Sequence, residues 1–321
     1  ILVNYGELYF AVWDSCEDNS TFLEQFETNC LQDLFDKTTH ARPDVFKSLM
    51  RVLSPIHDHK RDSGKRHGKK AGAVDAMLLK LYEPFLWRSL NVANPTVRHN
   101  AIVLLADLFP LQSPDISQHS DIEALATRQY DALYAALMDP SPNVRVVAVQ
   151  GCCRVLGTFW EIVPEARKKQ FVTRIVSELA YDQAACGVRV AVFEGLAFVL
   201  DNHLSHQAMK RILPALSNFI HDKSERVRSK FLDLLLQVKR IRDIRFYDIV
   251  PVDDLLERLS RDGGRPALAK KLTSLLVNSF FPAGQSVRER LSRATVLMDQ
   301  NPAAAIAFYA NLRQHVALPD I

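Results

Sequence analysis

The stretch VRHNAIVLLADL, residues 97–108, recurs in altered form three more times along this chain of 321 residues. Every copy opens with a Val-Arg pair, and successive copies lie 47, 44 and 39 residues apart. The residues four, eight and eleven positions after each valine are apolar, which is the pattern of one buried helix face. A weaker fifth copy has leucines at 268, 272 and 276. The other full copies are VRVVAVQGCCRV (144–155), VRVAVFEGLAFV (188–199) and VRSKFLDLLLQV (227–238).

Turn-forming residues stand before these copies, as in Asn94-Pro95, Asp139-Pro140-Ser141-Pro142 and Asp222-Lys223-Ser224. Proline suits a first helical turn, and Asp, Asn and Ser side chains can accept from the free amides there. A period of about 40–47 residues with two helices in each unit is typical of HEAT repeats. The sequence therefore predicts an all-α, HEAT-type α-solenoid of about six stacked antiparallel helix pairs in a right-handed superhelix. Such arrays bind partners more often than they catalyse.

Three parts are expected along the chain: an irregular helical lead-in over 1–56, a basic flexible loop over 57–72, and the solenoid over 73–321. Ser54-Pro55 is expected to end the last lead-in helix. The segment HDHKRDSGKRHGKK (57–70) offers almost no apolar surface to offset the entropy of ordering. The chain starts at Ile1 and its last helix pair lacks a polar cap, so a fragment of a longer protein, truncated at its C-terminal end, is expected. The predicted helix pairs are 73–91 with 95–109, 122–138 with 142–160, 166–181 with 186–201, 206–221 with 224–239, 252–260 with 265–281, and 286–298 with 302–315.

The charge is unevenly distributed, although the formal net charge is only +3. Residues 1–56 carry nine acidic and four basic side chains, whereas 57–70 carry six basic and two acidic ones. A second basic cluster covers 223–245. Both clusters are predicted to contact the DNA backbone, because each lysine or arginine can displace a condensed counterion. A solvated surface is the competing interpretation of both. The candidate contact residues are Lys60, Arg61, Lys65, Arg66, Lys69, Lys70, Lys223, Arg226, Lys230, Lys239, Arg240, Arg242 and Arg245.

The arginines of the Val-Arg pairs, Arg98, Arg145, Arg189 and Arg228, form a ladder with one member in each repeat. They could follow a phosphate chain. A structural role is favoured, in which each planar guanidinium bridges to an acidic residue of a neighbouring turn.

Catalytic and cofactor chemistry find no support in the sequence. It contains no glycine-rich phosphate loop, no GxSxG and no HExxH. His57, His59 and His67 have no rigid frame or nearby cysteine, so no metal site is predicted. The five cysteines show no CxxC spacing and favour reduced thiols in a core. No apolar run is long enough for a membrane span. The protein is therefore predicted not to be an enzyme, and to need no cofactor.

Several blocks outside the repeat pattern resemble the G2 subunit family of condensin II, in the same order along the chain. The resemblance covers about residues 23–315, and the 57–70 segment matches least well. It implies a HEAT-repeat, non-SMC subunit that binds a kleisin chain, acts with SMC ATPase subunits, and works on chromosomes in the mitotic nucleus. The blocks are LYEPFLWRSLNVANPTVRHNA (81–101), FVLDNHLSH (198–206), LPALSNFIHDKSERVR (213–228), SLLVNSFFP (274–282) and NPAAAIAFY (301–309).

Two functions thus stand beside each other. The first is a condensin II subunit that holds a kleisin segment on the concave face of the solenoid and contacts double-stranded DNA without reading its sequence. The alternative is a transport or trafficking adaptor that binds protein cargo. Adaptors of that kind usually have an acidic groove, so the basic clusters favour the first function.

Overall fold

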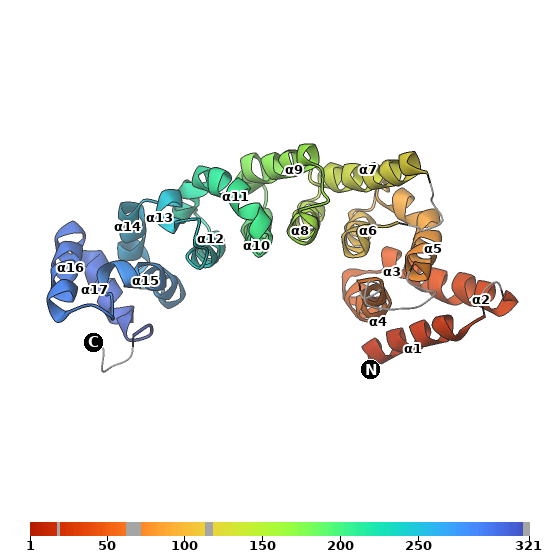
Figure 1. Cartoon of the computed structure of the whole chain (residues 1–321), viewed down its shortest axis with the longest axis horizontal. Coiled ribbons are helices and arrows are strands. Elements are labelled where there is room, and N and C mark those ends of the chain that lie inside the picture. Colours follow the sequence, from red (N-terminus) through yellow and green to blue (C-terminus); the bar gives the residue numbers. More distant parts are fainter. Residues whose placement is uncertain (18–19, 62–71, 113–117, 317–321) are drawn as a thin grey trace. The chain divides into compact units, whose positions relative to one another are not determined.

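The computed structural model describes residues 1–17, 20–61, 72–112 and 118–316. Throughout these ranges the regular secondary structure is helical (Figure 1), which confirms the predicted all-α, HEAT-type fold. The chain divides into two compact units, Ile1–Val155 and Leu156–Ile321, and the division falls within helix α8. The superhelical twist stays a prediction. Within the described ranges, no helix combines the length and the apolarity needed to cross a membrane.

The first unit begins with an irregular helical region and continues into regular pairs. Its α2 and α3 are joined by a π-helical segment, η1, so they form one continuous helical run. The bounds are α1 Leu2–Ser15, α2 Thr21–Phe26, η1 Glu27–Gln32, α3 Asp33–His40, α4 Pro43–Arg61, α5 Ala73–Ser89, α6 Pro95–Leu108, α7 His119–Ala136 and α8 Pro142–Phe159.

In its described part, up to residue 316, the second unit contains four helix pairs with short additions. The first helices of two repeats finish as 3-10 helices, η3 and η5, and a short helix, α13, lies in the connection after α12. The bounds are α9 Glu165–Ser177, η3 Leu179–Tyr181, α10 Cys186–Leu200, η4 His203–Ser205, α11 His206–Ile212, η5 Leu213–His221, α12 Glu225–Val238, α13 Phe246–Ile249, α14 Val252–Asp262, α15 Pro266–Phe280, α16 Val287–Gln300 and α17 Pro302–Leu312.

The predicted apolar stripe forms the core of each unit. Val97 is 6% exposed, and every other stripe position is at most 1% exposed. Aromatic side chains fill the space between repeats in the second unit, where the ring of Phe193 lies 5.0 Å from that of Phe219 and 5.2 Å from that of Phe231. Burial of such side chains stabilises a fold by about 1.5–3 kcal/mol each. The buried stripe therefore forms a continuous packed layer in each unit, and this layer fixes the positions of the turns and helix ends.

Helix α4 differs from the prediction, because it passes through Ser54-Pro55 and ends at Arg61. Proline inside a helix removes one amide donor, a cost that other contacts must offset. Close packing by α1 supplies those contacts: Gly6 lies against the carbonyl of Val52 and the ring of Pro55, so closely that a Cβ atom would not fit. The expected stop at Ser54-Pro55 is wrong, and residues 57–61 are helical rather than part of a loop.

Candidate nucleic-acid interface

The ladder arginines lie at the start of the second helix of each repeat, and the guanidinium groups of Arg98, Arg189 and Arg228 reach the next repeat. Arg98 donates from Nε and Nη2 to the two carboxylate oxygens of Asp139, at 2.6 and 2.8 Å. Its Nη1 donates to the carbonyl oxygens of Val92 and Ala93, at 2.8 and 2.7 Å. One side chain thus joins the turn before its own helix to the turn of the following repeat.

The same arrangement recurs in the second unit. Arg189 makes the bidentate contact with Asp222 at 3.0 and 3.2 Å, and Arg228 makes it with Asp262 at 3.1 and 3.2 Å. Both arginines are 4% exposed. Arg145 donates to the carbonyl oxygens of Asp139 and Pro140. We call each bidentate Arg–Asp pair a rung.

The charges of the rungs are stabilised by these contacts. The pKa of Arg98 is raised, first by its hydrogen bond to Asp139. Burial alone would raise the pKa of Asp139, but hydrogen bonds from Arg98 and from the Ser141 amide outweigh it and lower that pKa. The pKa of Asp262 is lowered in the same way, against burial, by Arg258 and Arg228. These contacts therefore favour the ionised carboxylate in the rungs of Asp139 and Asp262.

Lys60 does not form part of an exposed basic loop. Its side chain is 9% exposed and pairs with Asp75 at 3.1 Å, and it also donates to the carbonyl oxygens of Leu108 and Pro110. The extension of α4 turns this ammonium into the first unit, so Lys60 is not among the exposed cations, and its contact with DNA stays an untested prediction. Arg61 ends α4, and Lys65, Arg66, Lys69 and Lys70 lie outside the described residues.

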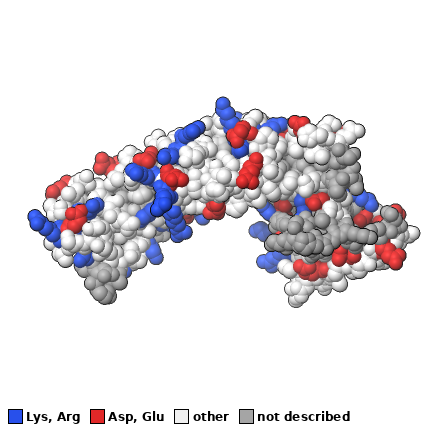
Figure 2. All heavy atoms as spheres, viewed as in Figure 1, with Lys and Arg blue, Asp and Glu red and all other residues white. Residues whose placement is uncertain are grey.

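The second basic cluster divides into held and exposed side chains. Lys230 pairs with Glu194 at 2.8 Å. Lys239 donates to the carbonyl oxygen of Ser274, and burial lowers its pKa. The remaining five members are exposed, and we call them the basic edge. Figure 2 shows lysine and arginine side chains gathered over the part of the second unit that Figure 1 labels α11 to α13. The basic edge consists of Lys223, Arg226, Arg240, Arg242 and Arg245.

Two histidines of the predicted loop belong to the packed part of the first unit. His57 is 1% exposed; its ring nitrogens lie 2.6 Å from a carboxylate oxygen of Asp107 and 3.1 Å from the hydroxyl of Tyr82. His59 stacks on the ring of Phe10 at 3.5 Å. No local sequence pattern predicts this network, because its members are as far apart as 50 positions in the chain.

Two of the five cysteines lie in the core, as predicted, and three are only half-buried. Cys152 and Cys153 are buried, and burial raises the pKa of Cys153 to about 12 and that of Cys152 well above its usual range. A thiol held neutral in this way is a poor nucleophile. The other three, Cys16, Cys30 and Cys186, are half-buried free thiols.

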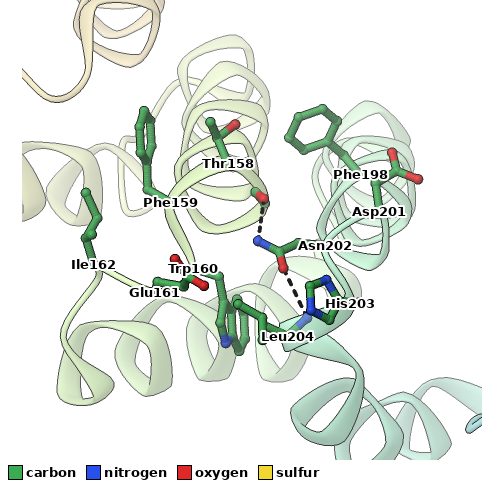
Figure 3. A pocket seen from close by; sticks show the side chains of 11 residues that line it. Thr158, Phe159, Trp160, Glu161, Ile162, Phe198, Asp201, Asn202, His203 and Leu204 are labelled. Atoms are coloured by element: carbon green, nitrogen blue, oxygen red, sulfur yellow. Dashed lines mark hydrogen bonds between the residues drawn. The ribbon is translucent and has the colours of Figure 1, made fainter. Parts of the chain in front are cut away.

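A recess of about 520 Å³ opens in the second unit between the end of α8 and the end of α10 (Figure 3). Asn202 spans it: its Nδ2 donates to the carbonyl oxygen of Gly157 at 3.0 Å, and its Oδ1 accepts from the amide of Leu204 at 3.0 Å. Ile162 and Phe198 are 61% and 43% exposed around it. The carboxylates of Glu161 and Asp201 and the ring of His203 also line the recess, so its wall combines apolar side chains with polar and charged ones.

Comparison with known proteins agrees with the resemblance predicted from the sequence. A family model described as a condensin II non structural maintenance of chromosomes subunit matches residues 1–113. Condensin-2 complex subunit G2 of Mus musculus is 35% identical over 323 residues, covering 100% of this chain and 27% of that protein. The Homo sapiens protein of the same name is 35% identical over 324 residues, with the same coverage. The chain thus spans about a quarter of the length of these relatives.

Among solved structures, a chain from the structure of the Pds5–Scc1 complex is similar to this one. The alignment covers 98% of this chain and 57% of that chain, at 15% sequence identity and a TM-score of 0.47.

Proposed function

Because this chain is related over its whole length to condensin-2 complex subunit G2, we propose that it acts as a non-catalytic part of a condensin II subunit. In this role it binds a kleisin segment, works with SMC ATPase subunits, and contacts double-stranded DNA on chromosomes in the nucleus. The observation that carries the DNA part is the basic edge, where five cations are exposed within 23 positions of the chain.

The basic edge suits phosphate rather than base recognition. Arg226 lies in the first turn of α12, whereas Arg240 and Arg242 lie in the turn that follows that helix and Arg245 precedes α13. Only Arg226 stands on a longer helix, in its first turn, and the other three extend from turns, so these side chains do not form a row along one helix, as in helical readers of a DNA groove. Contact with phosphates alone predicts binding that is independent of sequence and falls steeply as salt rises.

A salt titration of duplex DNA binding tests this proposal. Charge reversal of Arg240, Arg242 and Arg245 to glutamate should lower the slope of log affinity against log salt by about 2.7, at about 0.9 for each contact. The matched control reverses three other exposed cations, Arg42, Lys47 and Arg51 of the first unit. An unchanged slope in the edge variant, with the protein still folded, would exclude the basic edge from the DNA path.

The cations outside the described side chains remain part of the proposal and need their own variant. Reversal of Lys65, Arg66, Lys69 and Lys70 should lower the slope independently of the edge variant. If only this variant lowers the slope, DNA passes over the first unit and not over the basic edge.

The recess beside Asn202 supports the kleisin part of the proposal. An extended segment could place an apolar side chain against Phe198 and Ile162 and pair its backbone with the polar groups between them. Substitution of both residues by serine should reduce co-purification with a kleisin subunit. Ile306→Ser is the matched control, because Ile306 is 74% exposed on α17. Crosslinks placing every kleisin contact outside 73–321 would contradict the proposal.

A further inference from the structure

A cluster of three potential metal ligands lies between two consecutive repeats of the second unit. His221 is the last residue of η5, and Asp254 and Glu257 occupy consecutive turns of α14, which packs against η5. One ring nitrogen of His221 and one oxygen of each carboxylate all lie within 4.8 Å of one another. The three side chains are half-buried, and none belongs to the basic edge or the rungs.

An independent observation at His221 points to a missing partner. Its Nδ1 atom is buried from solvent and has no hydrogen-bond partner. A buried polar atom left unsatisfied destabilises a fold, so most such atoms in proteins have a partner. The carboxylate of Glu257 can still bind an ion. It pairs with Arg261 at 2.5 Å, but both side chains are about half exposed, and such surface pairs are weak.

We propose that His221, Asp254 and Glu257 bind a divalent transition-metal ion of the zinc class. One imidazole nitrogen and two carboxylate oxygens are ligands that Zn²⁺ accepts, with water as the fourth. Two carboxylates and a neutral imidazole also balance a charge of +2. The imidazole disfavours Mg²⁺ and Ca²⁺, which prefer oxygen ligands. Tetrahedral ligands on zinc lie roughly 3.3 Å apart, so small side-chain rotations close the site.

The metal would fasten a specific junction. At its C-terminal end, α14 is already joined to the preceding repeat by the rung between Arg228 and Asp262. The metal would add a second link near the N-terminal end of α14, through His221. Since the ion binds the folded junction and not the unfolded chain, it should stabilise these two repeats. This role does not depend on kleisin or DNA binding.

Calorimetric titration of the metal-free chain with Zn²⁺ tests the proposal. We expect one ion per chain and a rise in melting temperature that chelation by EDTA reverses. His221→Gln and Asp254→Asn should each weaken Zn²⁺ binding by more than about 100-fold, since even outer-shell partners of metal ligands contribute about 10–100-fold. Co²⁺ in place of Zn²⁺ should give the absorption of a four-coordinate site, which these variants lose.

The controls are His203→Gln and Asp253→Asn, exposed residues of the same kinds in the same unit. Both should keep the affinity of the unaltered chain. Unchanged binding in the His221 and Asp254 variants would overturn the proposal, because the ion would then lie elsewhere. Absence of binding at micromolar Zn²⁺ would also overturn it. Circular dichroism of each variant without metal shows whether it is folded.

Discussion

Arg226 and Arg228 lie two positions apart on α12, yet they belong to different regions of the molecule. Arg228 is 4% exposed and holds Asp262 of the next repeat, whereas Arg226 is exposed on the basic edge. Two positions along a helix correspond to a rotation of about 200° around its axis, so the two side chains leave on opposite sides.

The comparison teaches that the position of an arginine on the repeat decides its role. In a rung, the carboxylate and the backbone carbonyls use the donors of the guanidinium in a fixed arrangement, and loss of one partner leaves a buried charge. On the basic edge the charge stays solvated and can meet a phosphate, while its contribution to stability is small. The following predictions separate the two regions.

The largest effect is expected from breaking one rung. Arg189→Met leaves the carboxylate of Asp222, which is 9% exposed, without its bidentate partner. Such a loss destabilises a protein by about 3–5 kcal/mol. Urea unfolding followed by circular dichroism measures it, with Arg226→Met as the control that should change stability by less than about 0.5 kcal/mol. Equal effects of the two substitutions would erase the distinction between the regions.

A core substitution beside the rungs should cost somewhat less and should spread along the array. Leu196→Ala removes a side chain that is 1% exposed, and we expect a loss of about 2–5 kcal/mol. In a linear array, hydrogen exchange should accelerate mainly in the adjacent repeats. Uniform acceleration across the second unit would instead indicate a single cooperative core.

Acid should weaken the rungs that contain Asp139 and Asp262. The folded-state pKa values of Asp139 and Asp262 are below the ordinary value of 3.8. The folded protein therefore binds protons at these carboxylates less readily than the unfolded chain does. Their contribution is therefore present above about pH 4 and is lost as the pH falls through their folded-state pKa values. Urea midpoints at stepped pH should show a shallower acid loss in Asp139→Asn than in the unaltered chain. An identical pH profile would mean that other carboxylates dominate.

The smallest effect is expected from a single edge cation. Arg226→Gln should lower the salt slope of DNA binding by about 0.9 and leave stability almost unchanged. Lys230→Gln is the informative comparison, because Lys230 is already paired with Glu194 at 2.8 Å. The salt slope of DNA binding should therefore change less in Lys230→Gln than in Arg226→Gln. A larger change in Lys230→Gln would place the DNA path on the side of α12 that carries the Lys230–Glu194 pair.

Much of the fold was predictable because its determinants are local and repeated. The valine of each Val-Arg pair begins a stripe whose period matches the helix, and turn residues such as Pro95 and Ser224 mark the breaks. The observed α6 and α12 begin and end within one residue of the predicted ranges.

The remaining features depend on contacts between distant parts of the chain. Pro55 stays inside a helix because Gly6 permits α1 to pack against it, and Lys60 is buried because Asp75 and two carbonyl groups receive its ammonium. No local pattern distinguishes Lys239, which reaches Ser274, from its exposed neighbour Arg240. Composition could therefore indicate the basic cluster but could not select its exposed members.

Asp222 has a consequence for how such a chain can change in length. Its carboxylate accepts from Arg189 of the preceding repeat, while its carbonyl oxygen accepts from Arg228 of its own repeat, whose guanidinium pairs with Asp262 of the next repeat. Every repeat built in this way supplies the aspartate of one rung and the arginine of the next. Loss or duplication of a complete repeat during evolution would therefore still pair each arginine with an aspartate, and no buried charge would lose its partner. The array can thus be shortened or extended in whole steps, whereas an insertion inside a unit must preserve the reach from arginine to aspartate.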